Sequence, residues 1–340
     1  MSARIKNSKD PIKLKLPELK DEKKLIEPAI CDNILEIRRK QILDYIESQD
    51  ENEFKRIAKK YKVYFELCNA NKTFLETNLI NKYPLCSPDK ISSFKTLYDE
   101  SDLSLMDKKL FEIKDEFSNE KSKLRTPPVT LILRFSESPQ NRLLLNQWKY
   151  KKIEELGFKG FESFSNDLKN RGTVFHKTIE DFSNSGKNFE DINVEKLYEP
   201  AWKSLSDVFS KDITRILFTE CSVIHENLCY NGKFDSMCCY KDKIYIVDWK
   251  IGDKRKDKLR DLYDYPLQLV AYLAAFLVDN RYSVHRKEYD IKNVMVVHAY
   301  IDGSPPSIHC LNFHQIVSYW TKYLGRLQKF WINIKNGSMK

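Results

Sequence analysis

Two short apolar runs on either side of Lys241-Asp242 constrain the fold of this chain more than any other stretch. The first run is GKFDSMCCY over 232–240, and the second is KIYIVDWK over 243–250. A separation of two residues between apolar runs is typical of a β-hairpin. We therefore expect a hairpin that turns at Lys241-Asp242, although this pair is a poorer turn sequence than Asn-Gly.

Three charged side chains share one face of this predicted hairpin. The register places Asp235 opposite Asp248, with Cβ atoms about 5 Å apart. Lys250 follows Asp248 by two positions and so projects from the same face. Opposed like charges destabilise a sheet, and a divalent cation held between the two carboxylates would relieve that repulsion. Carboxylate ligands suit Mg²⁺ or Mn²⁺ rather than zinc.

The alternative interpretation is a solvated hairpin edge that carries these charges by chance. Both faces of the second run are apolar, with Ile244, Ile246, Tyr245, Val247 and Trp249. Apolar residues on both faces are typical of a central strand covered on both sides, where a charge is costly. Because buried charges concentrate at functional sites, we favour a functional site over a solvated hairpin edge.

Four motifs follow one another along the chain: F-H at Phe175-His176, G-K-F-D ending at Asp235, D-x-K at Asp248-Trp249-Lys250, and Q-x-x-x-Y from Gln268 to Tyr272. This order resembles the RecB-like branch of the PD-(D/E)XK nucleases and is far more specific than any single motif. The resemblance covers about residues 127–328. It extends to the members of that branch that act on mitochondrial DNA, which the chain resembles in segments such as LLLNQWK and VMVVHAYIDGSP.

The fold class that we expect is α/β. A mixed central sheet flanked by helices, the restriction-endonuclease-like core that the resemblance implies, would occupy residues 127–340. A helical N-terminal extension would precede it over 31–126, after a basic flexible arm over 1–30. The basic residues just before Pro127-Pro128 indicate a linker at that boundary.

Other elements are predicted from apolar periodicity and from helix start and stop signals. Helices are expected over 33–77, 103–117, 139–157 with Ser138 as N-cap, from Thr173 onward, Val194–Ser210, 266–278 and 313–331; strands are expected over 216–224 and 294–301.

The resemblance implies metal-dependent hydrolysis of phosphodiester bonds by Asp235, Asp248 and Lys250. The metal would be bound by the two aspartates together with His176 and the backbone carbonyl of Trp249. A lone histidine beside an apolar helix stripe more often packs than ligates, but its place in the motif order favours the ligand. Three further residues would support the site: Gln268, Tyr272 and Glu220. For Glu220, an ordinary edge-strand residue is nearly as good an interpretation.

A basic segment with neighbouring tyrosines follows the D-x-K motif directly. Its candidate nucleic-acid-binding residues are Lys254, Arg255, Lys256, Tyr263 and Tyr265. Lys and Arg bind phosphates irrespective of sequence, and tyrosines stack on unpaired bases. A solvated loop, with tyrosines that pack on the next helix, is the alternative.

The amino-acid composition excludes several classes of protein. The 340 residues are 41% hydrophobic, which excludes a chain disordered throughout. A net charge of +9 favours a polyanionic partner. No apolar run reaches the length of a membrane-spanning helix, so no membrane association is expected. The cysteines contain no C-x-x-C, and Cys310 stands alone after the core, so neither a disulfide framework nor an iron–sulfur cluster is expected.

The resemblance implies a monomeric exonuclease on single-stranded DNA, in mitochondria, beside other proteins of mitochondrial DNA replication. The first 24 residues carry four acidic residues, whereas transit peptides are rich in Arg and poor in acids. Two other functions stay open: an endonuclease specific for RNA or flap structures, and a nucleic-acid-binding relative without catalysis. Against the second, the set of Asp235, Asp248 and Lys250 is intact.

Overall fold

The computed structural model describes residues 28–67, 79, 83, 126–283, 285 and 291–339. Its centre is one five-stranded sheet with the order β1-β2-β3-β4-β5. The strands are β1 Ile213–His225, β2 Tyr230–Tyr240, β3 Lys243–Gly252, β4 Asn293–Tyr300 and β5 Ser307–Cys310. β3 and β4 are parallel and the other neighbours antiparallel, so the predicted mixed α/β architecture is confirmed.

The hairpin of β2 and β3 turns where the sequence predicted. Lys241 and Asp242 have φ angles of 47° and 64°. Positive φ at both central residues is the mark of a type I′ turn, whose twist matches that of the strands. The predicted register holds from Tyr240↔Lys243 to Ser236↔Val247. β3 therefore is the central strand, with Val247, Asp248 and Trp249 all buried.

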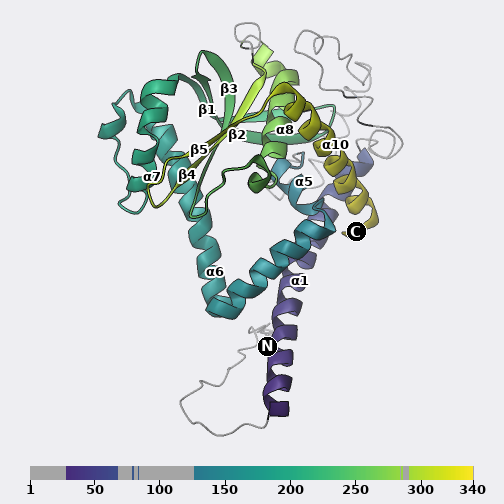
Figure 1. Ribbon diagram of the computed structural model, residues 1–340. Helices are drawn as coiled ribbons and strands as arrows, with labels where there is room; N and C mark the ends of the chain where they lie inside the picture. Colours follow the sequence, from purple (N-terminus) through teal and green to yellow (C-terminus); the bar gives the residue numbers. More distant parts are fainter. Residues whose placement is uncertain are drawn as a thin grey trace, which may run out of the picture.

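Helices cover both faces of the sheet (Figure 1). On one face lie α5 Val129–Phe135, α8 Tyr265–Val278 and α10 Phe313–Asn336; on the other lie α7 Glu199–Ser204 and the C-terminal arm of α6 Pro139–Ser185. Neighbouring residues of β3 divide between the two cores, since Ile246 belongs to the first and Val247 to the second. Because helices cover both faces of the sheet, both faces of β3 are apolar.

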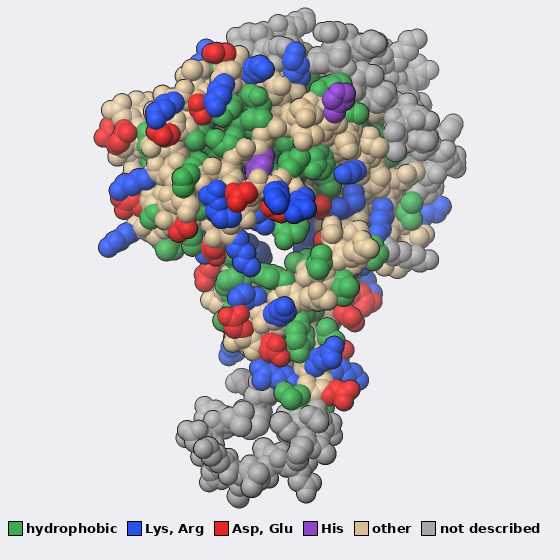
Figure 2. All heavy atoms as spheres, viewed as in Figure 1, with side chains coloured by type: hydrophobic (Ala, Val, Ile, Leu, Met, Phe, Trp, Pro, Cys, Tyr) green, Lys and Arg blue, Asp and Glu red, His purple; other side chains and the backbone are tan. Residues whose placement is uncertain are grey.

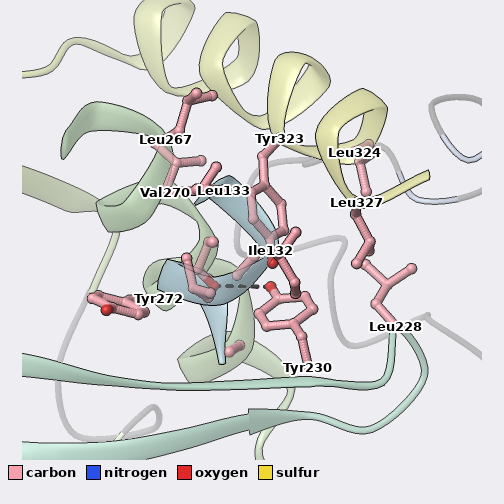
Figure 3. Packing of buried hydrophobic residues seen from close by; sticks show 14 of the residues in the cluster. Ile132, Leu133, Leu228, Tyr230, Leu267, Val270, Tyr272, Tyr323, Leu324 and Leu327 are labelled. Carbon is pink, nitrogen blue, oxygen red and sulfur yellow. Dashed lines mark hydrogen bonds between the residues drawn. The ribbon is translucent and has the colours of Figure 1, made fainter. Parts of the chain in front are cut away.

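Tyr230 of β2 lies at the centre of the first core, beneath α5 and α10 (Figure 3). Its ring meets that of Tyr323 edge-on, with centroids 5.2 Å apart. Its hydroxyl donates a hydrogen bond of 2.9 Å to the carbonyl of Ala271 in α8. The buried phenol is thus satisfied, and it links the strand that carries Asp235 to the helix that carries Gln268 and Tyr272.

Helix α6 is bent into a V at Gly157, whose φ and ψ are 70° and 172° (Figure 1). Ser138 caps its first arm by accepting a hydrogen bond from the backbone N–H of Asn141, as predicted. The prediction that the next helix starts near Thr173 is wrong, because the second arm begins directly after Gly157. Phe158 makes this early start possible, since its ring packs on Tyr45 of α1 at 4.9 Å.

Helix α1 Pro28–Leu67 packs on the same core as the sheet. Its buried side includes Phe54, Ile57, Tyr61 and Phe65. Residues 68–77 of the predicted N-terminal helix, the predicted helix over 103–117 and most of the arm over 1–30 lie outside the described residues. The predicted domain boundaries remain predictions.

One predicted helix, Val194–Ser210, is wrong in extent. The segment forms the short α7 and a separate π-helical turn over Val208–Asp212. Pro200 explains the late start, because a proline is tolerated in the first turn and restricts the residue before it. β1 and α10 extend beyond their predicted ends, whereas α8 and β4 match to within one residue.

The described helices include none whose length and apolar character would let it cross a membrane.

Candidate active site

His176 is held over the sheet by its helix neighbours. Phe175 and Ile179 of α6 are 1% and 2% exposed and belong to the second core, so the arm is fixed against β3. His176 Nε2 lies 2.7 Å from the carbonyl oxygen of Trp249 and 3.5 Å from Oδ2 of Asp235. The structure therefore brings together the predicted histidine, the first aspartate and the predicted carbonyl.

Asp235 sits where β2 departs from regular pairing with β3. Its Oδ2 accepts a hydrogen bond of 2.7 Å from the backbone N–H of Trp249. Burial, together with the charge of Asp248, raises the pKa of Asp235 to about 6, although Lys250, His176 and the Trp249 N–H oppose the shift. Burial and the neighbouring carboxylate thus disfavour the ionised form of Asp235, which a bound cation would stabilise.

Asp248 is 1% exposed at the centre of β3. Its Oδ2 forms an ion pair with Lys250 Nζ at 2.7 Å. Neither Oδ1 nor Oδ2 has a hydrogen-bond partner of good geometry among the described residues. Burial lowers the pKa of Lys250, but the charges of Asp248 and Asp235 outweigh this effect and raise it overall. Lys250 therefore carries its charge in the folded protein. The ammonium also lies 4.9 Å from the ring centroid of Tyr265.

Glu220 joins the site through an unusual backbone conformation. It has a φ of 53° inside β1, between the pairs Thr219↔Ser236 and Cys221↔Phe234. A non-glycine residue rarely adopts this conformation, which here interrupts the ladder opposite Asp235. Ligand atoms of His176, Glu220 and Asp235 lie within 4.8 Å of one another and could hold a metal ion.

Asp248 does not belong to this three-residue group, although its charge acts on Asp235. The site accordingly has two adjoining parts. One is the candidate metal-binding group of His176, Glu220 and Asp235, and the other is the ion pair of Asp248 with Lys250.

The two supporting residues on α8 form a pair, as their spacing predicts. Gln268 Nε2 donates a hydrogen bond of 2.8 Å to the Tyr272 hydroxyl. The Tyr272 ring lies against the backbone of Gly232, where a Cβ atom would come within 2.2 Å of its Cε1. Gly232 in the G-K-F-D motif therefore leaves room for this tyrosine.

The basic segment after β3 presents its side chains in different ways. Lys254 is exposed, whereas Arg255 stacks on the Tyr300 ring at 4.6 Å and donates to the Pro305 carbonyl at 2.7 Å. Lys256 Nζ lies 4.5 Å from the ring centroid of Tyr263. Figure 2 shows Lys and Arg side chains gathered beside a hollow in the middle of this face of the molecule.

The two tyrosines also differ. Tyr263 is 71% exposed, and Lys256 lies over its ring. Tyr265 is half-buried, next to Lys250. The nucleic-acid-binding roles of these residues remain predictions.

Two residues near the site were not predicted from the sequence. Lys233 forms an ion pair with Glu220, and Arg171 of α6 forms one with Asp253 just after β3. Lys233 stands within the G-K-F-D motif, which offered a signal. No pattern in the sequence indicated Arg171, because its partner lies 82 residues away.

No protein-family model matches this chain. The chain is similar to mitochondrial genome maintenance exonuclease 1 of Homo sapiens, with 31% identity over 214 residues, or 63% of this chain and 60% of the relative. It is 32% identical to the Mus musculus protein of the same name over 210 residues, which are 62% of this chain and 60% of that protein. For the Xenopus tropicalis protein, the identity is 29% over 253 residues, or 74% and 68%. The chain thus spans about 60% of the length of the first two relatives.

Proposed function

We propose that this chain is a metal-dependent nuclease of the PD-(D/E)XK type that hydrolyses phosphodiester bonds. The observation that carries the proposal is the meeting of His176 and Asp235 at the Trp249 backbone, beside the buried pair of Asp248 and Lys250. His176 contacts the Trp249 carbonyl, and Asp235 accepts a hydrogen bond from the Trp249 N–H. These residues come from α6, β2 and β3. They are distant in the sequence and meet only in the folded protein, which supports a shared role in one site.

The donor set fits a divalent cation. Carboxylates, an imidazole and a carbonyl converge. Burial and the charge of Asp248 disfavour the ionised form of Asp235, and Asp248 Oδ1 has no hydrogen-bond partner among the described residues. We infer that His176, Asp235, Asp248 and the Trp249 carbonyl hold Mg²⁺ or Mn²⁺, with Glu220 as a further ligand. When bound, such an ion lowers the pKa of a coordinated water and polarises the phosphoryl oxygens.

The remaining roles belong to residues of the chain itself. Lys250, fixed by Asp248, would orient the attacking water and offset negative charge that develops on the phosphoryl group. The pair of Gln268 and Tyr272 would hold α8 and the adjoining backbone in place. A buried position of these groups makes their electrostatic effect stronger than in water.

Digestion from an end is the mode that we infer from the name of the relatives. Single-stranded DNA is the substrate that we infer from the resemblance of the motifs. The exposed Tyr263 beside Lys256 supports this choice, since an aromatic ring with a neighbouring ammonium suits unpaired bases and their phosphates. A role in the maintenance of mitochondrial DNA belongs to the same proposal.

The test is digestion of end-labelled single-stranded DNA, duplex DNA and RNA, each with Mg²⁺ or with EDTA. We expect stepwise shortening of single-stranded DNA with Mg²⁺ alone. Preferred cleavage of RNA, or internal cuts in a flap substrate, would instead support the other nuclease functions. Binding without cleavage under all conditions would contradict the proposal.

A further inference from the structure

We propose that Lys233 is a positioning residue that acts as a built-in cation: it holds Glu220 and takes the place of a second metal ion. The inference rests on the proposed nuclease function. It concerns how many divalent ions the site takes and which side chain supplies the remaining positive charge.

Lys233 stands two residues before Asp235 on β2, and the two side chains therefore leave the same face of the strand. Its ammonium forms an ion pair with Oε2 of Glu220 and also interacts electrostatically with Asp235 and with Glu180 of α6. Glu180 follows His176 by one helical turn. The ammonium of Lys233 is thus paired with one carboxylate, Glu220, and lies in the field of two more, Asp235 and Glu180.

The backbone of Glu220 shows that this arrangement is specific. With its φ of 53°, Glu220 interrupts the pairing of β1 and β2 opposite Asp235. Such a conformation persists only where the surroundings determine it. Two carboxylates that face each other across a ladder repel. Lys233 precedes Asp235 by two residues on β2 and lies diagonally across the ladder from Glu220, where its charge offsets that repulsion.

An exposed ion pair ordinarily contributes little. This pair differs because Glu220 also belongs to the group that could ligate a metal. Nucleases with two metal ions place them about 4 Å apart to stabilise the attacking and the leaving oxygen. A fixed ammonium on Glu220 repels a second ion at that distance and supplies one positive charge itself. The site would therefore take one divalent ion.

The experiment is calorimetric titration of the full chain with Mn²⁺, in parallel with single-turnover hydrolysis at saturating Mg²⁺. Lys233→Met removes the charge and keeps the length of the side chain, whereas Lys233→Arg keeps the charge. Lys203→Met is the matched control, since it removes the 2.6 Å ion pair with Glu199 on α7, outside the site.

We expect one Mn²⁺ per wild-type chain. Lys233→Met should bind a second ion, or bind the first about threefold more tightly, because one repelling charge is gone. Its hydrolysis should fall about tenfold or more. Lys233→Arg keeps the charge and should still bind one Mn²⁺, whereas Lys203→Met should match the wild type in both measurements.

Unchanged Mn²⁺ binding by Lys233→Met, whatever its rate, would overturn the inference, and so would two ions in the wild type. Both results leave the nuclease proposal standing if the wild type degrades DNA. A wild type that neither binds Mn²⁺ nor cleaves would overturn both.

Discussion

The Nε2 atom of His176 lies 2.7 Å from the carbonyl oxygen of Trp249, 73 residues further along the chain. The contact joins the second arm of α6 to the strand that carries Asp248 and Lys250. It depends on the burial of Phe175 and Ile179, which fix the helix on the sheet. An ion ligated by both His176 and the Trp249 carbonyl would replace this hydrogen bond.

A first prediction concerns metal affinity at His176. We expect His176→Ala to need a higher Mg²⁺ concentration for half-maximal hydrolysis, by about tenfold, because one ligand is lost. His176→Gln can still donate to the Trp249 carbonyl and separates ligation from hydrogen bonding. If the histidine only packs, His176→Ala will lower the melting temperature and leave the Mg²⁺ titration unchanged.

A second prediction concerns the stability of the buried ion pair. Lys250→Met leaves the carboxylate of Asp248 buried without its partner, so we expect the free energy of unfolding at pH 7 to fall by about 3 kcal/mol. The double variant Asp248→Asn with Lys250→Met removes both charges and should recover part of this loss. Chemical denaturation of the metal-free protein measures both, and equal losses in the two variants would contradict the pairing.

A third prediction concerns the glycine beneath Tyr272. Gly232→Ala would place a methyl group 2.2 Å from Tyr272 Cε1, so the Tyr272 ring or the helix α8 that carries it must shift away from β2. We expect a loss of about 1–3 kcal/mol in stability and a marked loss of activity. Gly172→Ala in α6 is the control, because nothing lies within 4 Å of the added Cβ and alanine favours a helix. A stable, active Gly232→Ala would show that the ring moves freely.

A fourth prediction concerns pH. Burial lowers the pKa of His225 from 6.5 to about 3, so this side chain is neutral in the folded protein but charged in the unfolded chain below pH 6.5. Its contribution to stability is complete above pH 6.5 and is lost as the pH falls toward 3, by up to about 1.4 kcal/mol per pH unit.

His225→Phe keeps a ring against Trp320 and Tyr230 but cannot take up a proton. It should therefore flatten the fall in melting temperature between pH 6.5 and 4. Burial also lowers the pKa of His298, to about 4, so a smaller slope should persist. A variant with the full wild-type slope would contradict the assignment to His225.

Apolar patterns were sufficient to predict the central hairpin, α8 and β4. These elements are buried on all sides, so their sequences are continuous apolar runs. The length of each run and the turn residues at its ends then indicate whether it is a strand or a helix. The start of the second arm of α6 could not be predicted, because it depends on contacts of Phe158 with a helix more than 100 residues earlier.

Some residues of the candidate site could be predicted from the sequence, and others could not. Asp235, Asp248 and Lys250 lie on one strand pair, so the hairpin register predicts that they lie near one another, although the regular pairing of the two strands ends at Ser236↔Val247. The inclusion of Glu220 follows from a backbone conformation that no propensity favours in a strand. Lys233 and Arg171 act through ion pairs between separate elements, and such pairs leave no periodic signal in the sequence.

The most direct test of the account is single-turnover hydrolysis of end-labelled single-stranded DNA by Asp248→Asn at saturating Mg²⁺. The substitution keeps the size of the side chain and removes the charge that faces Lys250 and the metal. The account predicts a loss of about 10²-fold or more relative to the wild type, with the fold retained. A rate above about one tenth of the wild-type rate would contradict it.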